Sequence, residues 1–417
     1  MKKTHVLSKG RKKAIGDLIL SMIAYGVPVL VNQVIVLPLI NHFTDENTYG
    51  YIITIVSLFS LIPHTLGKTL NTSRLINAKH YVDNSASGDF AVLFCVSELI
   101  GVIAFSIGWF INTENRSIIR LVLLLITCAL WLGREYAIVS HRLNINYKCI
   151  CINGIIFSSG YLVGIFLFSL GVFGAYWEFI YILGQAASLV YTLTTSKLLV
   201  GIKKRTTNLW KTTVSHLKLL FAASINSIGD NMDKMLIFSM LGAASVSVFY
   251  AASVFTKIVS LTVTPINSVV LSYLSKKKTM SLKTIGLVAS AALGVGVIGY
   301  VVCLLIARPV IGLLYREYLD EAMKYVYLTS AYTMLRLGYA MLRPFVVMFK
   351  NLNWEIASNI VTVASYISMA LWLVPKMGIM GMCISYVVGG VLRILLVLVA
   401  FFGKAIKDKT IHRKRQE

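Results

Sequence analysis

Long apolar runs fill most of the sequence, and short polar or turn-rich breaks separate them. A helix that spans a bilayer needs about 20 mostly apolar residues. The breaks divide the chain into twelve runs of at least this length: 16–40, 48–70, 89–111, 117–141, 148–170, 174–199, 216–241, 245–275, 281–306, 320–349, 352–375 and 378–403. The pattern predicts an all-α polytopic membrane protein with about twelve transmembrane helices.

The composition strengthens this prediction and argues against enzyme classes. Hydrophobic residues make up 57% of the 417 residues and charged residues only 14%, whereas a soluble domain carries about 25% charge. The six cysteines lie in or near apolar runs and lack a second ligand pair, which argues against a disulfide framework or a zinc site. We find no nucleophile–base constellation and no phosphate loop, so we expect no enzyme activity, cofactor or metal.

The basic residues predict the orientation in the membrane. Of the 40 Lys and Arg residues, 30 fall on one side of the predicted spans, six on the other and four inside spans. Cytoplasmic loops carry such an excess, so we expect both termini in the cytoplasm. The net charge of +23 then reflects topology in a bacterial inner membrane and not nucleic-acid binding.

The longest polar cytoplasmic stretch lies in the middle of the chain. It divides the protein into an N-terminal six-helix lobe, a basic linker and a C-terminal six-helix lobe with a basic tail, at 1–200, 201–215 and 216–417. Shifting the second half back by 199 residues places Asn231 on Asn32 and Ser253 on Thr54. Parallel repeats of this kind are common in transporters, so the layout indicates alternating access.

Three sequence segments resemble a known superfamily. They are GVPVLVNQVIVLPLI in the first span, LGAASVSVFYAASVFTKIVSLTVTPINSVVLSYLSK around the eighth, and LVPKMGIMGMCISYVVGGVLR between the last two. Together they are similar to the multidrug/oligosaccharidyl-lipid/polysaccharide exporter superfamily, and within it to the Wzx-type O-antigen flippases. The chain departs from the usual Gly-x-Tyr before the eighth span, where it has Ser-Val-Phe-Tyr.

The resemblance implies a polyprenyl-diphosphate-linked oligosaccharide as substrate. It also implies contact with membrane lipid and with other polysaccharide-assembly proteins, and we expect a monomer that binds no nucleic acid. Because two phosphates cannot cross hydrocarbon unaided, a flippase must offer a polar, cationic cavity. Ionisable residues inside spans are therefore the candidates for its site.

Four basic residues are predicted to bind the diphosphate. Lys257 shares a helix face with Ser253, Ser260 and Thr264, which are spaced at helical intervals. The other three are Arg336, Arg343 and Lys68. Ion pairing inside the protein and snorkelling to the interface are the alternatives.

Three acidic residues are predicted to couple transport to an ion gradient. Asp233 and Glu98 lie inside spans, where a carboxylate can carry a proton. Asp230 also belongs to this set, although it can pair with Lys234 four residues later and leave Asp233 available. Glu178, near the outer end of the sixth span, is interpreted as a solvated interface residue, and Arg393 as a lone cation that can snorkel.

Glycines inside spans predict close helix packing. They include Gly160 and Gly164 in the fifth span, and Gly294, Gly296 and Gly299 in the ninth. Pro28, Pro38, Pro63 and Pro265 are predicted to kink spans.

Two other functions stay open. A multidrug exporter of the same superfamily would need a net acidic cavity, whereas the charges inside the spans lean cationic. A membrane polysaccharide polymerase would need a large outer loop, and the predicted outer loops are short.

Overall fold

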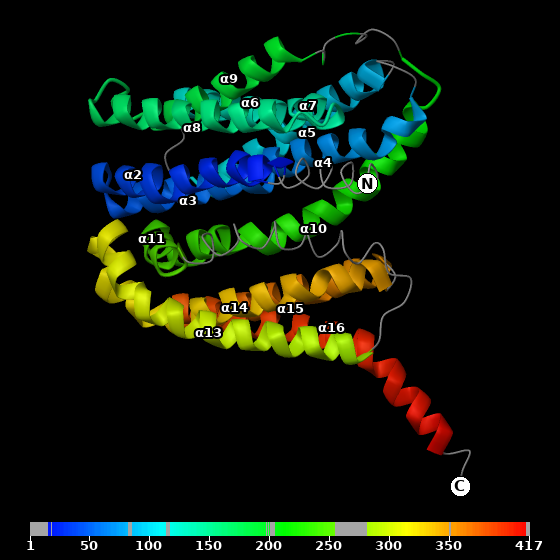
Figure 1. Ribbon diagram of the computed structural model, residues 1–417. Helices are drawn as coiled ribbons and strands as arrows, with labels where there is room; N and C mark the ends of the chain where they lie inside the picture. Colours follow the sequence, from blue (N-terminus) through cyan, green and yellow to red (C-terminus); the bar gives the residue numbers. More distant parts are fainter. Residues whose placement is uncertain are drawn as a thin grey trace, which may run out of the picture. The chain divides into compact units, whose positions relative to one another are not determined.

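Helices joined by short turns make up the part of the chain that the computed structural model describes (Figure 1). That part comprises residues 16–17, 19–81, 86–113, 117–196, 198, 200, 205–254, 282–349 and 352–413. It contains no β-strand, which confirms the predicted all-α class. The chain divides into two compact units, Met1–Met235 and Leu236–Glu417.

The first unit is built from helices that run along one another. Its elements are η1 (Val31–Val36), α2 (Leu37–Phe43), α3 (Glu46–Leu61), α4 (Pro63–Asn77), η2 (Ala78–His80), α5 (Ala86–Ile111), α6 (Ile118–Ala137), α7 (Val139–Leu143), α8 (Tyr147–Ser169), α9 (Glu178–Thr195) and most of α10 (Leu209–Leu241). Within it, α6 packs against both α4 and α9, and α8 packs against α9.

The second unit has the same all-helical character. Its elements are α11 (Ala243–Ala252), α13 (Leu282–Leu314), η4 (Arg316–Tyr318), α14 (Leu319–Phe349), α15 (Leu352–Met377) and α16 (Ile379–Arg413). Helix α14 packs against α11, α13 and α16, and α15 packs against α16. Figure 1 shows α13, α14, α15 and α16 running side by side.

A helix break and a π-helical segment both lie beside prolines in the sequence. Helix α3 ends at Leu61 and α4 begins at Pro63, because a proline ring removes a backbone donor and clashes with the preceding turn. The first helical run contains a π-helical segment, Val31–Val36, and then Pro38 in the first turn of α2. The interruption predicted at Pro63 is therefore confirmed, while Pro265 lies outside the described residues.

Eight described helices are long and apolar enough to cross a membrane: Ile19–Phe43, Glu46–Asn77, Ser87–Ile111, Ile118–Leu143, Tyr147–Ser169, Gly286–Leu314, Trp354–Met377 and Ile379–Phe401. Helices α10 and α14 are also long but are richer in polar residues. They carry Asp233, Lys234 and Arg336. The predicted eighth span, 245–275, is described only as far as residue 254.

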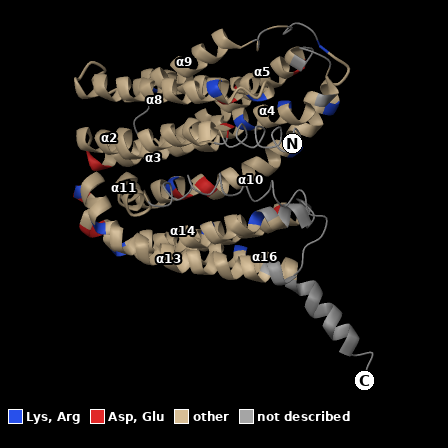
Figure 2. Ribbon diagram, in the orientation of Figure 1, with Lys and Arg blue, Asp and Glu red and all other residues tan. Residues whose placement is uncertain are grey.

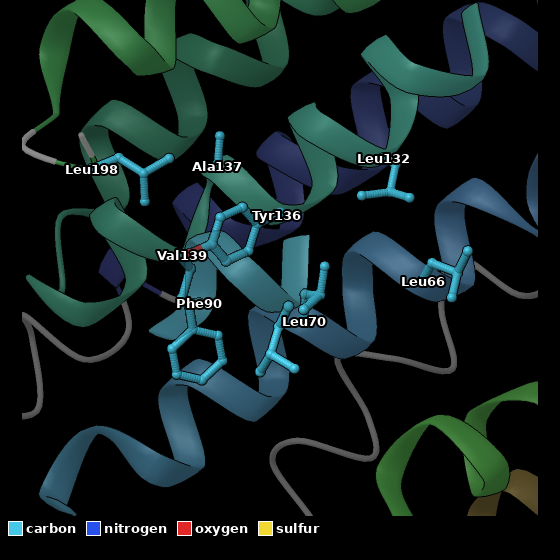
Figure 3. Close-up of a cluster of buried hydrophobic side chains, with 9 residues drawn as sticks. Leu66, Leu70, Phe90, Leu132, Tyr136, Ala137, Val139 and Leu198 are labelled. Carbon is cyan, nitrogen blue, oxygen red and sulfur yellow. The ribbon is translucent and has the colours of Figure 1, made fainter. Parts of the chain in front are cut away.

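A buried apolar cluster fixes how α4, α5 and α6 pack (Figure 3). Leu66 and Leu70 of α4 lie against Leu132 and Tyr136 of α6, and Phe90 comes from α5. These contacts set the rotation of α6 about its own axis. They therefore decide which way the polar residues between Leu132 and Tyr136 can point.

A buried carboxylate ties the predicted linker to α5. Asp89, at the start of α5, accepts hydrogen bonds from the backbone N–H of Thr206 at 2.8 Å and from its hydroxyl at 2.5 Å. The Tyr81 hydroxyl also donates to Asp89, at 3.0 Å. The chain that leads into α10 is thus anchored beside α5.

The predicted topology can be tested with two exposed residues. Asn47 lies in the first turn of α3, beside the helix cap in which Thr48 hydrogen-bonds to Asp45 and lowers the pKa of that carboxyl. Thr207 lies in the linker before α10. In a Cys-free background, we expect an impermeant thiol reagent on whole cells to label Asn47→Cys and not Thr207→Cys, and the reverse pattern would overturn the orientation.

Candidate functional site

Polar side chains from three helices, α4, α6 and α7, surround Glu135 on α6. His64 Nδ1 lies 3.0 Å from the Glu135 carboxylate, and the neighbouring Arg134 forms an ion pair with the same oxygen. Asn71 donates a hydrogen bond to the Glu135 carbonyl oxygen at 2.9 Å and accepts one from Arg142 at 2.7 Å. The result is one carboxylate held inside a cationic cluster.

One face of α4 supplies the contacts to Glu135. His64, Gly67, Lys68 and Asn71 recur at intervals of three and four residues and therefore share that face. A Cβ atom on Gly67 would lie only 2.6 Å from the Leu132 carbonyl oxygen and 2.7 Å from the Glu135 Cβ. Glycine at this position is what lets the two helix backbones approach so closely.

Arg134 is held from its other side by α8 and α9. Its Nε donates to the Gln185 side chain at 2.6 Å, and its guanidinium lies 4.2 Å from the Phe157 ring centroid. Gln185 in turn donates to the Tyr161 hydroxyl at 3.2 Å. Because Gln185 and Tyr161 are buried, these contacts fix the guanidinium in one place.

The charge of this cluster is unbalanced. Lys68 lies close enough to Glu135 to interact with it electrostatically, so Lys68, Arg134 and His64 face a single carboxylate, and Arg142 joins the cluster through its hydrogen bond to Asn71. Lys68 is exposed, and 36% of the His64 side chain is accessible, against 13% for Glu135. Figure 2 shows basic and acidic residues close together near the labels of α4 and α5. The cluster is thus an accessible site with excess positive charge.

The predicted substrate-binding residues have different surroundings. Lys68 lies at the cluster just described, and Arg336 lies halfway along α14, partly buried. Arg343 forms a 2.6 Å ion pair with the buried Glu355 of α15. This is the internal ion pairing that the sequence analysis gave as the alternative to substrate binding. Lys257, with Ser260 and Thr264, lies outside the described residues.

The predicted coupling residues lie in the first unit. Lys234 contacts the Asp233 carboxylate at 2.7 Å and 2.5 Å, and both side chains are buried. The expectation that Asp233 stays available is therefore wrong, because its neighbour in sequence reaches it within one helix. Asp230 is partly buried on the same helix. Glu98 of α5 has one buried carboxylate oxygen without a hydrogen-bond partner among the described residues.

Two interpretations from the sequence are corrected. Glu178 is fully buried and pairs with Arg120 Nε at 2.9 Å, so it is not a solvated interface residue. Arg393 hydrogen-bonds to Asn359 and lies 3.9 Å from the centroid of the Tyr339 ring. It is therefore held inside the second unit and does not snorkel as a lone cation.

Sequence reasoning missed Arg134, Glu135 and Arg142 as parts of one site. Arg134 and Glu135 lie in α6, which ends at Ala137, and Arg142 lies in α7, which ends at Leu143. The signal was an Arg-Glu pair inside an apolar helix, since ionisable residues at such positions are rare and functional.

Comparison with known proteins identifies the fold. No protein-family model matches the chain, and no curated protein matches its sequence. A structure of the lipid II flippase MurJ, in an inward closed conformation, aligns over 93% of this chain and 87% of its own, with a TM-score of 0.73 and 14% identity.

Multidrug transporter structures align as well. An inward-facing MATE-family transporter of the MOP superfamily covers 94% of this chain and 95% of its own, with a TM-score of 0.67 and 12% identity. A MOP-superfamily transporter from Pyrococcus furiosus, described as having a binding pocket of reversed polarity, covers 94% and 96%, with a TM-score of 0.56 and 14% identity. The chain is thus a multi-pass, all-α membrane protein with the fold that these flippase and multidrug transporter structures share.

Proposed function

We propose that this protein is a flippase for an undecaprenyl-diphosphate-linked oligosaccharide, the repeat unit of an O-antigen or a similar surface polysaccharide. It moves this lipid from the cytoplasmic to the outer leaflet of a bacterial inner membrane, by alternating access and with an ion gradient as the energy source. In this proposal twelve helices span the membrane, both termini are cytoplasmic, and Lys257 and Arg336 contact the substrate together with Lys68.

The excess positive charge around Glu135 carries the proposal. A diphosphate is a compact anion that loses its hydration when it enters a protein, and charge-assisted hydrogen bonds from Arg and Lys compensate for that loss. Lys68, Arg134 and Arg142 offer such donors from three helices. The fold supports the same class, since one similar structure is of a lipid II flippase.

A multidrug exporter fits the fold equally well, because MATE transporters are among the similar structures. Charge is what separates the two candidates. A cavity that binds cationic drugs needs uncompensated carboxylates. Glu135 and Asp233 both have basic partners, while Glu98 has one carboxylate oxygen without a hydrogen-bond partner among the described residues. The observed balance therefore favours an anionic substrate.

The experiment compares three ligands on the purified full-length protein in nanodiscs. We expect saturable binding of undecaprenyl diphosphate that weakens as salt is raised, because screening reduces charge-assisted contacts. The matched control is undecaprenol, which has the same tail without phosphates and should bind weakly. If the protein binds a cationic dye such as ethidium saturably and does not bind undecaprenyl diphosphate, the multidrug exporter becomes the better assignment.

A further inference from the structure

Glu135 places a negative charge in the middle of the cationic cluster. Its carboxylate pairs with Arg134 and lies 3.0 Å from His64 Nδ1, while Lys68 lies within electrostatic reach. An anion that enters from the exposed side at His64 and Lys68 meets donors that this carboxylate already occupies. The substrate and Glu135 therefore compete for the same cations.

We propose that Glu135 is an internal counter-ion that fills the cationic site when substrate is absent and that the diphosphate displaces. This inference rests on the proposed function and adds how the site releases its ligand. A site with three unopposed cations would hold a diphosphate tightly and deliver it slowly. A carboxylate that returns to Arg134 and His64 competes for those donors and so promotes release.

The surroundings of Glu135 allow this exchange. Besides Arg134 on its own helix, the charged and titratable groups that interact with it are His64 and Lys68 from α4, Tyr25 from the first helix and Tyr161 from α8. None of these is a second carboxylate. Arg134 stays in place when Glu135 moves, because Gln185 and Phe157 hold its guanidinium independently.

The backbone around Glu135 is rigid, so the exchange needs only side-chain movement. The close approach at Gly67 fixes α4 against α6, and the Asn71 hydrogen bond holds the Glu135 carbonyl. Only the carboxylate has to turn away from Arg134. The Glu135 side chain is 13% accessible, so it is not enclosed on every side.

The test measures binding of farnesyl diphosphate to wild-type protein and to variants in nanodiscs. Freeing the donors that Glu135 occupies should make Glu135→Gln bind about tenfold more tightly, the equivalent of one charge-assisted contact. Glu178→Gln is the matched control, since it removes the carboxylate of another buried Glu–Arg pair in the same unit. It should bind like wild type.

Transport provides the second measurement. In proteoliposomes, Glu135→Gln should move lipid-linked substrate more slowly than wild type although it binds diphosphate more tightly. Glu135→Asp keeps the charge but shortens the side chain, so it should show an intermediate gain in affinity and stay measurable if Glu135→Gln fails to fold. If both variants bind diphosphate as wild type does or more weakly, while wild-type binding is normal, Glu135 is not an internal counter-ion. Absence of wild-type diphosphate binding would instead overturn the proposed function.

Discussion

Replacing Lys68 with alanine is expected to lower transport by roughly one to two orders of magnitude, because one charged contact to a diphosphate contributes about 1.5–3 kcal/mol. The fold should tolerate this change. The Lys68 side chain is exposed, and it attracts the Glu135 carboxylate electrostatically at the cationic cluster. The expected result is thus loss of activity at unchanged protein abundance.

The same loss is expected for Lys257→Ala and Arg336→Ala, the two central candidates of the sequence pattern. Arg336→Lys should rescue only in part, since an ammonium group cannot form the planar fork of a guanidinium. The measurement is surface polysaccharide in a strain that lacks the native gene, normalised to membrane-inserted protein. If these cations instead hold the fold together, neutralising them should reduce abundance.

Lys376→Ala is the control for these lysine variants. Lys376 is exposed and lies 3.9 Å from the ring centroid of Trp372, near the end of α15. Its loss should leave polysaccharide at the wild-type level. Normal polysaccharide from Lys68→Ala, Lys257→Ala and Arg336→Ala at equal abundance would contradict a cationic substrate site and leave the fold untouched.

The helices were predictable because their signals are local. Continuous apolar runs are enough to place α5, α8 and α15 within a few residues, and Pro63 places the break between α3 and α4. Errors arise where a helix continues past a polar residue. Helix α13 runs on to Leu314 through Pro309, although its predicted end lay at 306.

The site was less predictable because its contacts join distant parts of the chain. Lys68 was found from its charge alone, whereas the His64–Glu135 contact links residues 71 positions apart. The ion pair between Asp233 and Lys234 depends on how the two side chains are rotated on α10, which the sequence does not show. Arg120 and Glu178 each lie near a helix end, and the sequence cannot show that α6 and α9 bring them together.

Glycine packing shows the same limit. Gly160 and Gly164 do allow close contact of α8 with α9, as predicted, and Gly299 lies against Met334. For Gly294 and Gly296 the prediction of close packing is wrong, since a Cβ atom at either would meet nothing within 4 Å in the described part of the chain. A glycine-rich helix face indicates packing only when another helix covers that face.

Replacing Gly160 with leucine is expected to destabilise the first unit severely. A Cβ atom there would lie 2.6 Å from the Gly184 Cα and 3.0 Å from its backbone nitrogen, and a backbone cannot move aside as a side chain can. Overpacking costs about 1–3 kcal/mol for small insertions and more for larger ones. Gly160→Ala should therefore lower the melting temperature, and Gly160→Leu should lower it further.

The damage should extend to the cationic cluster, because α9 carries Gln185. If Gly160→Ala pushes α9 away from α8, Gln185 loses its bond to Tyr161 and Arg134 loses its support. The measurement is thermal unfolding of purified protein together with farnesyl diphosphate binding. Gly294→Leu is the matched control and should change stability by no more than about 0.5 kcal/mol, as surface substitutions do. Equal melting temperatures for Gly160→Leu, Gly294→Leu and wild type would show that the α8–α9 contact does not hold this unit together.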